Sequence, residues 1–264
     1  MFLLGRHICF PSSPRYLELA DSADYFIAHD NWPRAEKAIL EALRLEPANF
    51  SNSLLLANLG LVQSNMGQFD KALQSLSLGL NIAPSSAVLL NNRAHTYLMM
   101  DSVAKATLDL DRSLSIDSIQ EWTLQTRAFI YLQDKNTKKA EDILQKMVVN
   151  FPNNPSVFSG LAVNAEYDGN YEEAKKLYQK ALELNEKDDE ARESLIALLI
   201  KNNDYTAARS QIKKGLELNA ENPMYYLLRG YLHRLNFRLE EAQADKKIAV
   251  SKGLDASYVS SFIP

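Results

Sequence analysis

Cysteine is nearly missing from this chain of 264 residues, which contains only Cys9. A single cysteine cannot form an intramolecular disulfide, and it rules out a zinc site built from several thiolates. The scarcity fits a reducing compartment, so we expect a cytoplasmic protein. A cysteine-poor protein of the periplasm would have the same composition.

Long apolar runs are also lacking. No stretch approaches the ~18 consecutive apolar residues that a transmembrane helix requires, so the sequence predicts no membrane span. The N-terminal stretch MFLLGRHICF is apolar, but Arg6 and His7 interrupt it and no small-residue cleavage site follows. It therefore does not resemble a signal peptide, and we interpret residues 1–15 as an N-terminal extension.

An excess of one charge is absent as well. The chain has 29 lysines and arginines against 33 acidic residues, a net charge of −4. This balance gives no reason to expect binding to nucleic acid or to an anionic membrane. Hydrophobic residues make up 46% and charged residues 23%, which is typical of globular proteins.

Sequence motifs for chemistry are missing too. The four histidines are scattered, with no H-E-x-x-H pair, and the chain has no G-x-G-x-x-G and no G-x-S-x-G. We therefore predict no metal site, no cofactor and no catalytic residues. The chain is not expected to be an enzyme.

A repeated pattern is what the sequence does contain. Alanine recurs at a spacing of 34 residues, apart from one spacing of 37, at Ala35, Ala72, Ala106, Ala140, Ala174, Ala208 and Ala242. Around each alanine, two runs with apolar residues every three or four positions are separated by a short polar turn. This spacing is helical, and a fixed period in this range indicates an array of small helical units.

The alanine register divides the chain into seven units of 34 residues with one insertion, Phe50–Asn52, at the first join. The predicted units are 16–49, 53–86, 87–120, 121–154, 155–188, 189–222 and 223–256. Residues 257–264 form a C-terminal tail, which we expect to cap the last unit. The alternative is that the tail inserts into a neighbouring molecule.

Two further columns explain how the units would pack. A mostly small residue precedes each alanine by twelve positions: Ala23, Gly60, Ala94, Ala128, Ala162, Ile196 and Gly230. Facing the alanines, these residues would let the two helices approach closely. A large residue should pack against the next unit: Ile39, Leu76, Leu110, Leu144, Tyr178 and Ile212. Lys246 takes this position in the last unit, so the array is predicted to end there.

The period, the alanine, the small residue before it and the closing proline resemble the tetratricopeptide repeat. Residues 53–86 carry the signature best, with Leu56, Leu59, Gly60, Phe69, Ala72, Leu76, Gly79 and Pro84 in matching places. The resemblance covers residues 16–256. It implies an all-α fold, a right-handed superhelix of antiparallel helix pairs in which the first helices line a concave groove. It also implies a non-enzymatic module that binds proteins or peptides.

The concave side should carry the binding residues. Spacings of three, four and three place four side chains of each first helix on that side. In the fourth to seventh units they include Trp122, Phe129 and Tyr231, and Tyr167 lies alongside. Large apolar groups on such a surface suggest anchor points for a partner. The alternative is that curvature buries them between neighbouring helices.

Two known modes of peptide binding in the family help to narrow the kind of partner that is expected. The inward positions lack the lysines with which some members clamp a terminal carboxylate. Asn58 and Asn92 match two rungs of the asparagine ladder that holds a peptide backbone in other members. The predicted binding residues are Asn58, Asn91, Asn92, His95, Trp122, Gln125, Phe129, Tyr167, Tyr231 and Arg234.

We therefore expect a protein- or peptide-binding scaffold. One alternative is a structural subunit that self-associates through its ends or its tail, giving a homo-oligomer. Another is an accessory or regulatory subunit of an enzyme encoded as a separate chain. The identity of the partner does not follow from the sequence.

Overall fold

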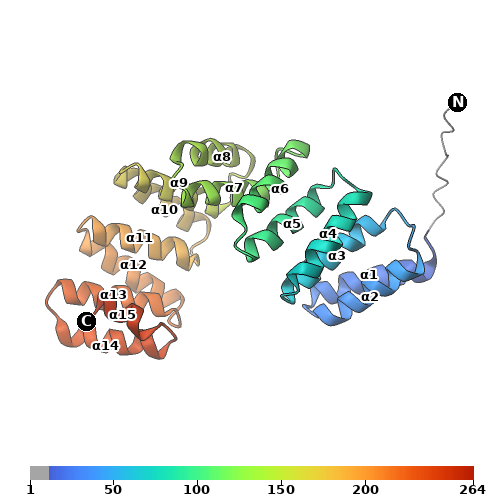
Figure 1. The fold of residues 1–264 in the computed structure, drawn as a ribbon. Coiled ribbons are helices and arrows are strands. Elements are labelled where there is room, and N and C mark those ends of the chain that lie inside the picture. The colour runs from blue at the N-terminus through green and yellow to red at the C-terminus, as the bar shows by residue number, and fades with distance from the viewer. Residues whose placement is uncertain (1–11) are drawn as a thin grey trace. The chain divides into compact units, whose positions relative to one another are not determined.

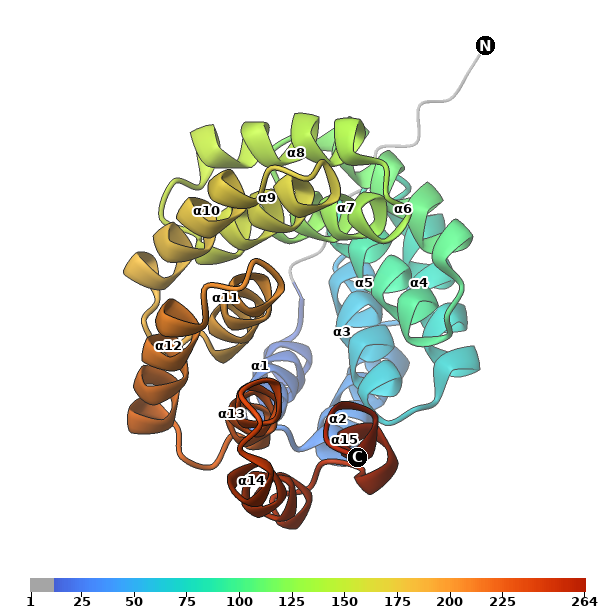
Figure 2. The same ribbon diagram turned by 90° about the vertical axis from the view of Figure 1, so that its left-hand side faces the viewer.

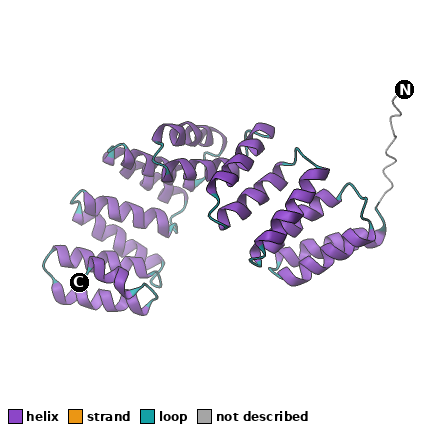
Figure 3. Cartoon of the chain, in the orientation of Figure 1, coloured by secondary structure: helices purple, strands orange, loops and turns teal. Residues whose placement is uncertain are grey.

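The computed structural model describes residues 12–264, which form fifteen α-helices and no strand (Figures 1 and 3). The chain divides into two compact parts, Met1–Thr123 and Leu124–Pro264, which we call the first and second unit. The 34-residue segments predicted from the sequence are called repeats from here on. The fold class is the predicted one, an all-α superhelical repeat of helix pairs. Cys9 and most of the predicted N-terminal extension fall outside the described residues.

The first unit contains the pairs α1–α2, α3–α4 and α5–α6. Their bounds are α1 Pro14–Ala28, α2 Trp32–Leu45, α3 Asn52–Asn65, α4 Phe69–Ile82, α5 Ala87–Met99 and α6 Val103–Ile116. The boundary between the units lies within α7, which spans Glu121–Gln133.

The second unit continues from α7 with α8 Thr137–Asn150, α9 Pro155–Tyr167, α10 Tyr171–Leu184, α11 Asp189–Lys201, α12 Tyr205–Leu218, α13 Pro223–Leu235, α14 Leu239–Ser251 and α15 Ala256–Phe262. Within this unit, α9, α11 and α13 lie on the inner side of the row, and α8, α10, α12 and α14 on the outer side (Figure 2). Each second helix from α8 to α12 also contacts the first helix that follows it.

The alanine column lies at the centre of each pair. All seven alanines are at most 1% exposed, as expected for a position where two helix backbones come close. At Gly60, the partner position in the second repeat, a methyl group would overlap Leu76. The large column, from Ile39 to Ile212, is at most 3% exposed in its six apolar members.

A further column, which sequence analysis did not identify, lies in the turn between the two helices of each repeat. One residue there has a positive φ in every repeat: Asp30, Gly67, Asp101, Lys135, Gly169, Asn203 and Phe237. The next residue donates its N–H to a carbonyl five positions back, as Gln68 does to Gln63 at 2.8 Å. This is the Schellman ending of a helix, and its left-handed residue reverses the chain between the two helices.

The first helix begins earlier than predicted. Pro14 was expected to belong to the N-terminal extension, but it is the first residue of α1, and the Ser13 hydroxyl accepts from the Tyr16 N–H as the N-cap. Proline suits this position because the first helical N–H has no partner within the helix. Pro155 and Pro223 begin α9 and α13 in the same way.

The sixth repeat holds a buried arginine at a register position where the other six repeats have leucine, phenylalanine or tyrosine. Arg192 is 3% exposed, and its guanidinium donates to Gln211 Oε1 at 2.7 Å and to the Glu186 carbonyl at 2.6 Å. These bonds satisfy the buried cation, so the repeat keeps its two helices.

The C-terminal helix α15 packs on α13 and α14 of the last repeat. Val259 and Ile263 are at most 1% exposed and belong to a cluster with Leu227, Ala242 and Ala249. The apolar side of α15 is therefore buried against its own chain.

Candidate protein-binding face

The predicted binding residues lie on the first helices. We call the side chains at the second, fifth, ninth and twelfth positions of each repeat, together with Tyr167 next to the twelfth position of the fifth repeat, the first-helix face. The second position is open in the first three repeats, where Leu17, Leu54 and Val88 are 50–61% exposed.

Other positions of this face are closed, contrary to expectation. Neighbouring first helices contact each other directly, as α3 does with α5 and α11 with α13. Five side chains of the predicted open face are buried: Ala57, Ser64, Leu132, Ile200 and Leu227. Leu227 belongs to a cluster with Val259 and Ile263 of the tail. The first-helix face is consequently narrower than the helical spacing alone indicated.

The predicted asparagine rungs connect successive first helices. Asn58 Nδ2 donates to Asp24 Oδ1 at 2.9 Å, and Asn92 Nδ2 donates to the Ala57 carbonyl at 3.0 Å. Each bond joins one repeat to the preceding one. The amide nitrogens of both asparagines are therefore already engaged within the chain.

His95 and Trp122 form an aromatic pair in the first unit. Their rings meet edge to face, with centroids 6.2 Å apart, and Trp122 is 41% exposed. Beside them, Asn91 Nδ2 donates to Gln120 Oε1 at 2.8 Å, while Gln120 in turn donates to the carbonyls of Ser113 and Asp117. This network fixes the chain that leads from α6 into α7.

The second unit presents Gln125, Phe129 and Tyr167 to solvent. Phe129 on α7 is 58% exposed and Tyr167 at the end of α9 is 46% exposed. The proposed alternative of burial between helices does not describe these two rings. Both rings are therefore open to contact with a partner.

Tyr231 and Arg234 are engaged by α15. The Tyr231 ring stands edge-on to Phe262 at 5.8 Å, and Arg234 Nη1 donates to the Phe262 carbonyl at 2.7 Å. Tyr231 is consequently only partly exposed. The tail, rather than a neighbouring repeat, is what covers this end of the first-helix face.

Two ion pairs occupy the same register positions in the third and seventh repeats. Arg93 binds both carboxylate oxygens of Asp109 at 2.7 Å, and Arg229 binds those of Asp245 at 2.9 and 2.6 Å. Hydrogen bonding to the aspartate raises the pKa of each arginine. Because Asp109 and Asp245 are at most 5% exposed, the pairs hold first and second helices together.

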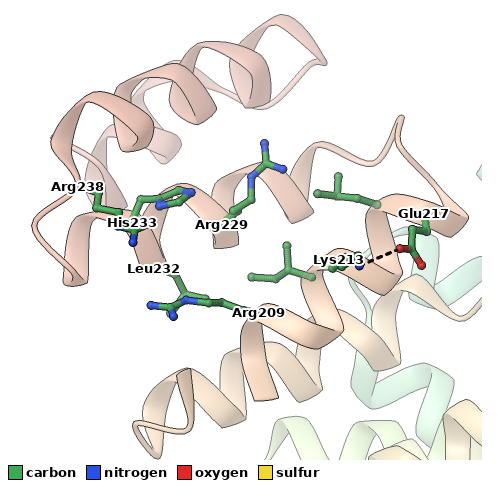
Figure 4. A pocket seen from close by; sticks show the side chains of 9 residues that line it. Arg209, Lys213, Glu217, Arg229, Leu232, His233 and Arg238 are labelled. Carbon is green, nitrogen blue, oxygen red and sulfur yellow. Dashed lines mark ion pairs between the residues drawn. The ribbon is translucent and has the colours of Figure 1, made fainter. Parts of the chain in front are cut away.

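The structure contains a basic cavity on the other side of α13 that the sequence alone did not indicate (Figure 4). The signal in the sequence is Arg238, since each of the other six repeats has asparagine, glutamine, serine or aspartate at its register position. Within residues 12–264, no three His, Cys, Asp or Glu side chains are grouped to hold a metal ion. Nor does that part of the chain contain a helix long and apolar enough to cross a membrane.

Comparisons with known proteins match two segments of the chain to one family. Residues 55–86 and 167–230 match the sequence profiles of the tetratricopeptide repeat family. No curated protein matches the chain.

Several solved structures are similar. A tetratricopeptide repeat protein from Parabacteroides merdae is 25% identical with a TM-score of 0.76, and the match covers 95% of this chain and 98% of that one. The pilF protein of Pseudomonas aeruginosa is 21% identical with a TM-score of 0.64, over 74% and 88% of the two chains. Cut9, from the APC/C hetero-tetramer Cut9–Hcn1, is 14% identical with a TM-score of 0.67, over 93% and 54%. The last two show similarity of fold.

Proposed function

The chain is a tetratricopeptide repeat protein, and from this premise we propose that it is a non-enzymatic scaffold that binds a protein or peptide on its first-helix face. Proteins of this family bind other proteins and are generally non-catalytic. The proposal adds which surface is used and which residues contact the partner.

The exposed aromatic rings of the first helices carry the proposal. Trp122 in the first unit and Phe129 and Tyr167 in the second are 41–58% exposed. Aromatic side chains are frequent anchors of protein interfaces, because they bury much apolar area with little loss of side-chain entropy. Asn91 and His95 would supply polar contacts beside Trp122, and Gln125 would supply one beside Phe129.

Packing of the tail makes us favour a different protein over self-association. Self-association through the tail would require its apolar side for a neighbouring copy, whereas Val259 and Ile263 are buried in their own chain. An enzyme encoded separately is one class of partner that the scaffold would serve. The single cysteine is why we place the protein in the cytoplasm.

Site-specific photo-crosslinking tests the proposal. A benzoylphenylalanine replacing Phe129 or Tyr167 in the full chain should cross-link a protein from the source cell, to be identified by mass spectrometry. Val149 on the second helix α8 is 79% exposed and provides a matched control position. With the captured protein purified, we expect Phe129→Ala/Tyr167→Ala to weaken its binding at least about tenfold.

Two results would refute this assignment. One is equal cross-linking from positions 129 and 149. The other is unchanged affinity of the purified partner for the double variant while circular dichroism shows an intact fold.

A further inference from the structure

A cavity of about 490 Å³ lies between α12 and α13, with Arg238 at the start of α14 on its border (Figure 4). Its volume falls in the range of small-ligand sites. Ile212, Leu216 and Leu232 contribute the apolar part of its lining. The polar lining consists of Arg209, Lys213, Glu217, Arg229, His233 and Arg238.

The cavity is separate from the first-helix face. At 100° per residue, Arg229 and His233 lie roughly opposite Tyr231 around α13. A ligand in the cavity would therefore contact residues that the proposed function does not use.

The cations that line the cavity differ in how they are neutralised. Arg229 is held by both oxygens of Asp245, and Lys213 Nζ lies 3.8 Å from Glu217 Oε1. Arg209 and Arg238 are both exposed, and their guanidinium groups have no hydrogen bond or ion pair with any residue of 12–264. In Figure 4 these two arginines border one end of the cavity together with His233, while Lys213 and Glu217 occupy the other. Two positive charges are thus left for an external anion.

A second cavity shows that the fold does not require this charge. It has about 440 Å³ and lies two repeats earlier, lined by the corresponding helices α8, α9 and α10. In the repeat register, Glu141 replaces Arg209 and Asn170 replaces Arg238. Glu141 is satisfied internally, since it accepts from Gln145 at 2.7 Å and from Asn164 at 3.0 Å. The cavity is a property of the repeat, whereas the unpaired arginines are a property of this one site.

We propose that the basic cavity binds an acidic peptide segment of a partner protein, with a carboxylate next to an apolar side chain. Guanidinium groups bind carboxylates through two parallel hydrogen bonds, so Arg209 and Arg238 would take the carboxylate. The apolar neighbour would pack on Ile212, Leu216 and Leu232. A purely anionic ligand such as phosphate would leave that apolar lining unused.

Fluorescence anisotropy with a labelled peptide in which glutamates alternate with leucines tests the proposal on the full chain. The decisive variant is Arg209→Glu/Arg238→Asn, because Glu141 and Asn170 already occupy these register positions in the same fold. We expect it to weaken peptide binding at least about tenfold. Peptides with glutamine for glutamate, or with serine for leucine, should also bind at least about tenfold more weakly.

Lys247→Glu/Lys176→Gln is the matched control, since it changes the net charge equally at exposed lysines that do not line the cavity. It should bind the peptide like the natural chain. Absence of binding to the natural chain, or equal binding by the decisive variant, would overturn the proposal. Equal binding of the glutamate–serine peptide, or displacement by tripolyphosphate at the peptide's own concentration, would show a simple anion site and overturn it as well. None of these outcomes depends on Phe129 or Tyr167, so the proposed function is tested separately.

Discussion

The cavities of α8–α10 and α12–α14 occupy the same place in two repeats but contain different chemistry. In the first, Leu161 and Leu177 line the cavity, and in the second Arg229 and Asp245 take the equivalent positions. The turn residue is Gly169 in one and Phe237 in the other. The repeat fold therefore tolerates an apolar pair or an ion pair, and glycine or phenylalanine, at fixed positions. Placing residues of one repeat at the equivalent positions of the other tests whether the two repeats share a packing scheme.

Breaking the ion pair should have the largest effect. Asp245→Ala removes both charge-assisted hydrogen bonds that Arg229 donates to this buried carboxylate, and we expect a loss of about 3 kcal/mol in unfolding free energy. Arg229→Leu/Asp245→Leu, which copies the other cavity, should recover most of this loss. Urea unfolding measures both. A double variant as unstable as Asp245→Ala would mean that the ion pair is required.

Enlarging a buried side chain to the size found in the other repeat should have the next largest effect on stability. Gly215 packs against the Tyr225 ring, and the register equivalents in the other region are Met147 and Val157. Gly215→Met should destabilise the chain by about 2 kcal/mol through overpacking.

Adding Tyr225→Val makes room for the methionine and should restore part of that stability, measured by thermal unfolding. Recovery should be incomplete, because the Tyr225 hydroxyl donates to Asp189 Oδ1 at 2.6 Å. No recovery at all would show that the two repeats do not share a packing scheme.

Replacing the turn residue Phe237 by glycine should have a smaller effect on the unfolding free energy, and this change should be stabilising. Phe237 has a φ of 59° and is 91% exposed, so its ring gains little packing while its backbone is strained. Phe237→Gly should stabilise the chain by about 1 kcal/mol, as relief of left-handed strain exceeds the added entropy of the unfolded chain. Gly169→Phe should lower stability by a similar amount in the same urea titration. A destabilised Phe237→Gly variant would indicate that the ring makes a stabilising contact.

The smallest stability effect is expected for the unpaired arginines. Arg209→Glu/Arg238→Asn should change the unfolding free energy by less than about 0.5 kcal/mol, because neither exposed side chain is bound within the chain. Differential scanning calorimetry checks this. A large loss would assign the arginines a role in folding and would remove the reason for expecting a ligand there.

Part of the candidate site was accessible from the sequence. The helical spacing located the first helices and selected Phe129 and Tyr167, which are exposed. It also placed Leu132 and Ile200 on the open face, where the structure buries them. Spacing describes one helix at a time, whereas burial depends on how closely the neighbouring first helix approaches. Coverage of Tyr231 by Phe262 likewise results from the position of the tail.

The sequence by itself determined the repeat length, the helix pairs and the close approach at the alanine column, because these follow from local periodicity and side-chain size. Tertiary structure decided which polar groups neutralise one another. Arg229 meets Asp245 and Arg192 meets Gln211, while Arg209 and Arg238 have no partner in the described chain. Such pairing depends on distances of a few ångströms between side chains on neighbouring helices. The same distances left one cavity with two unpaired arginines, whereas no arginine lines the other.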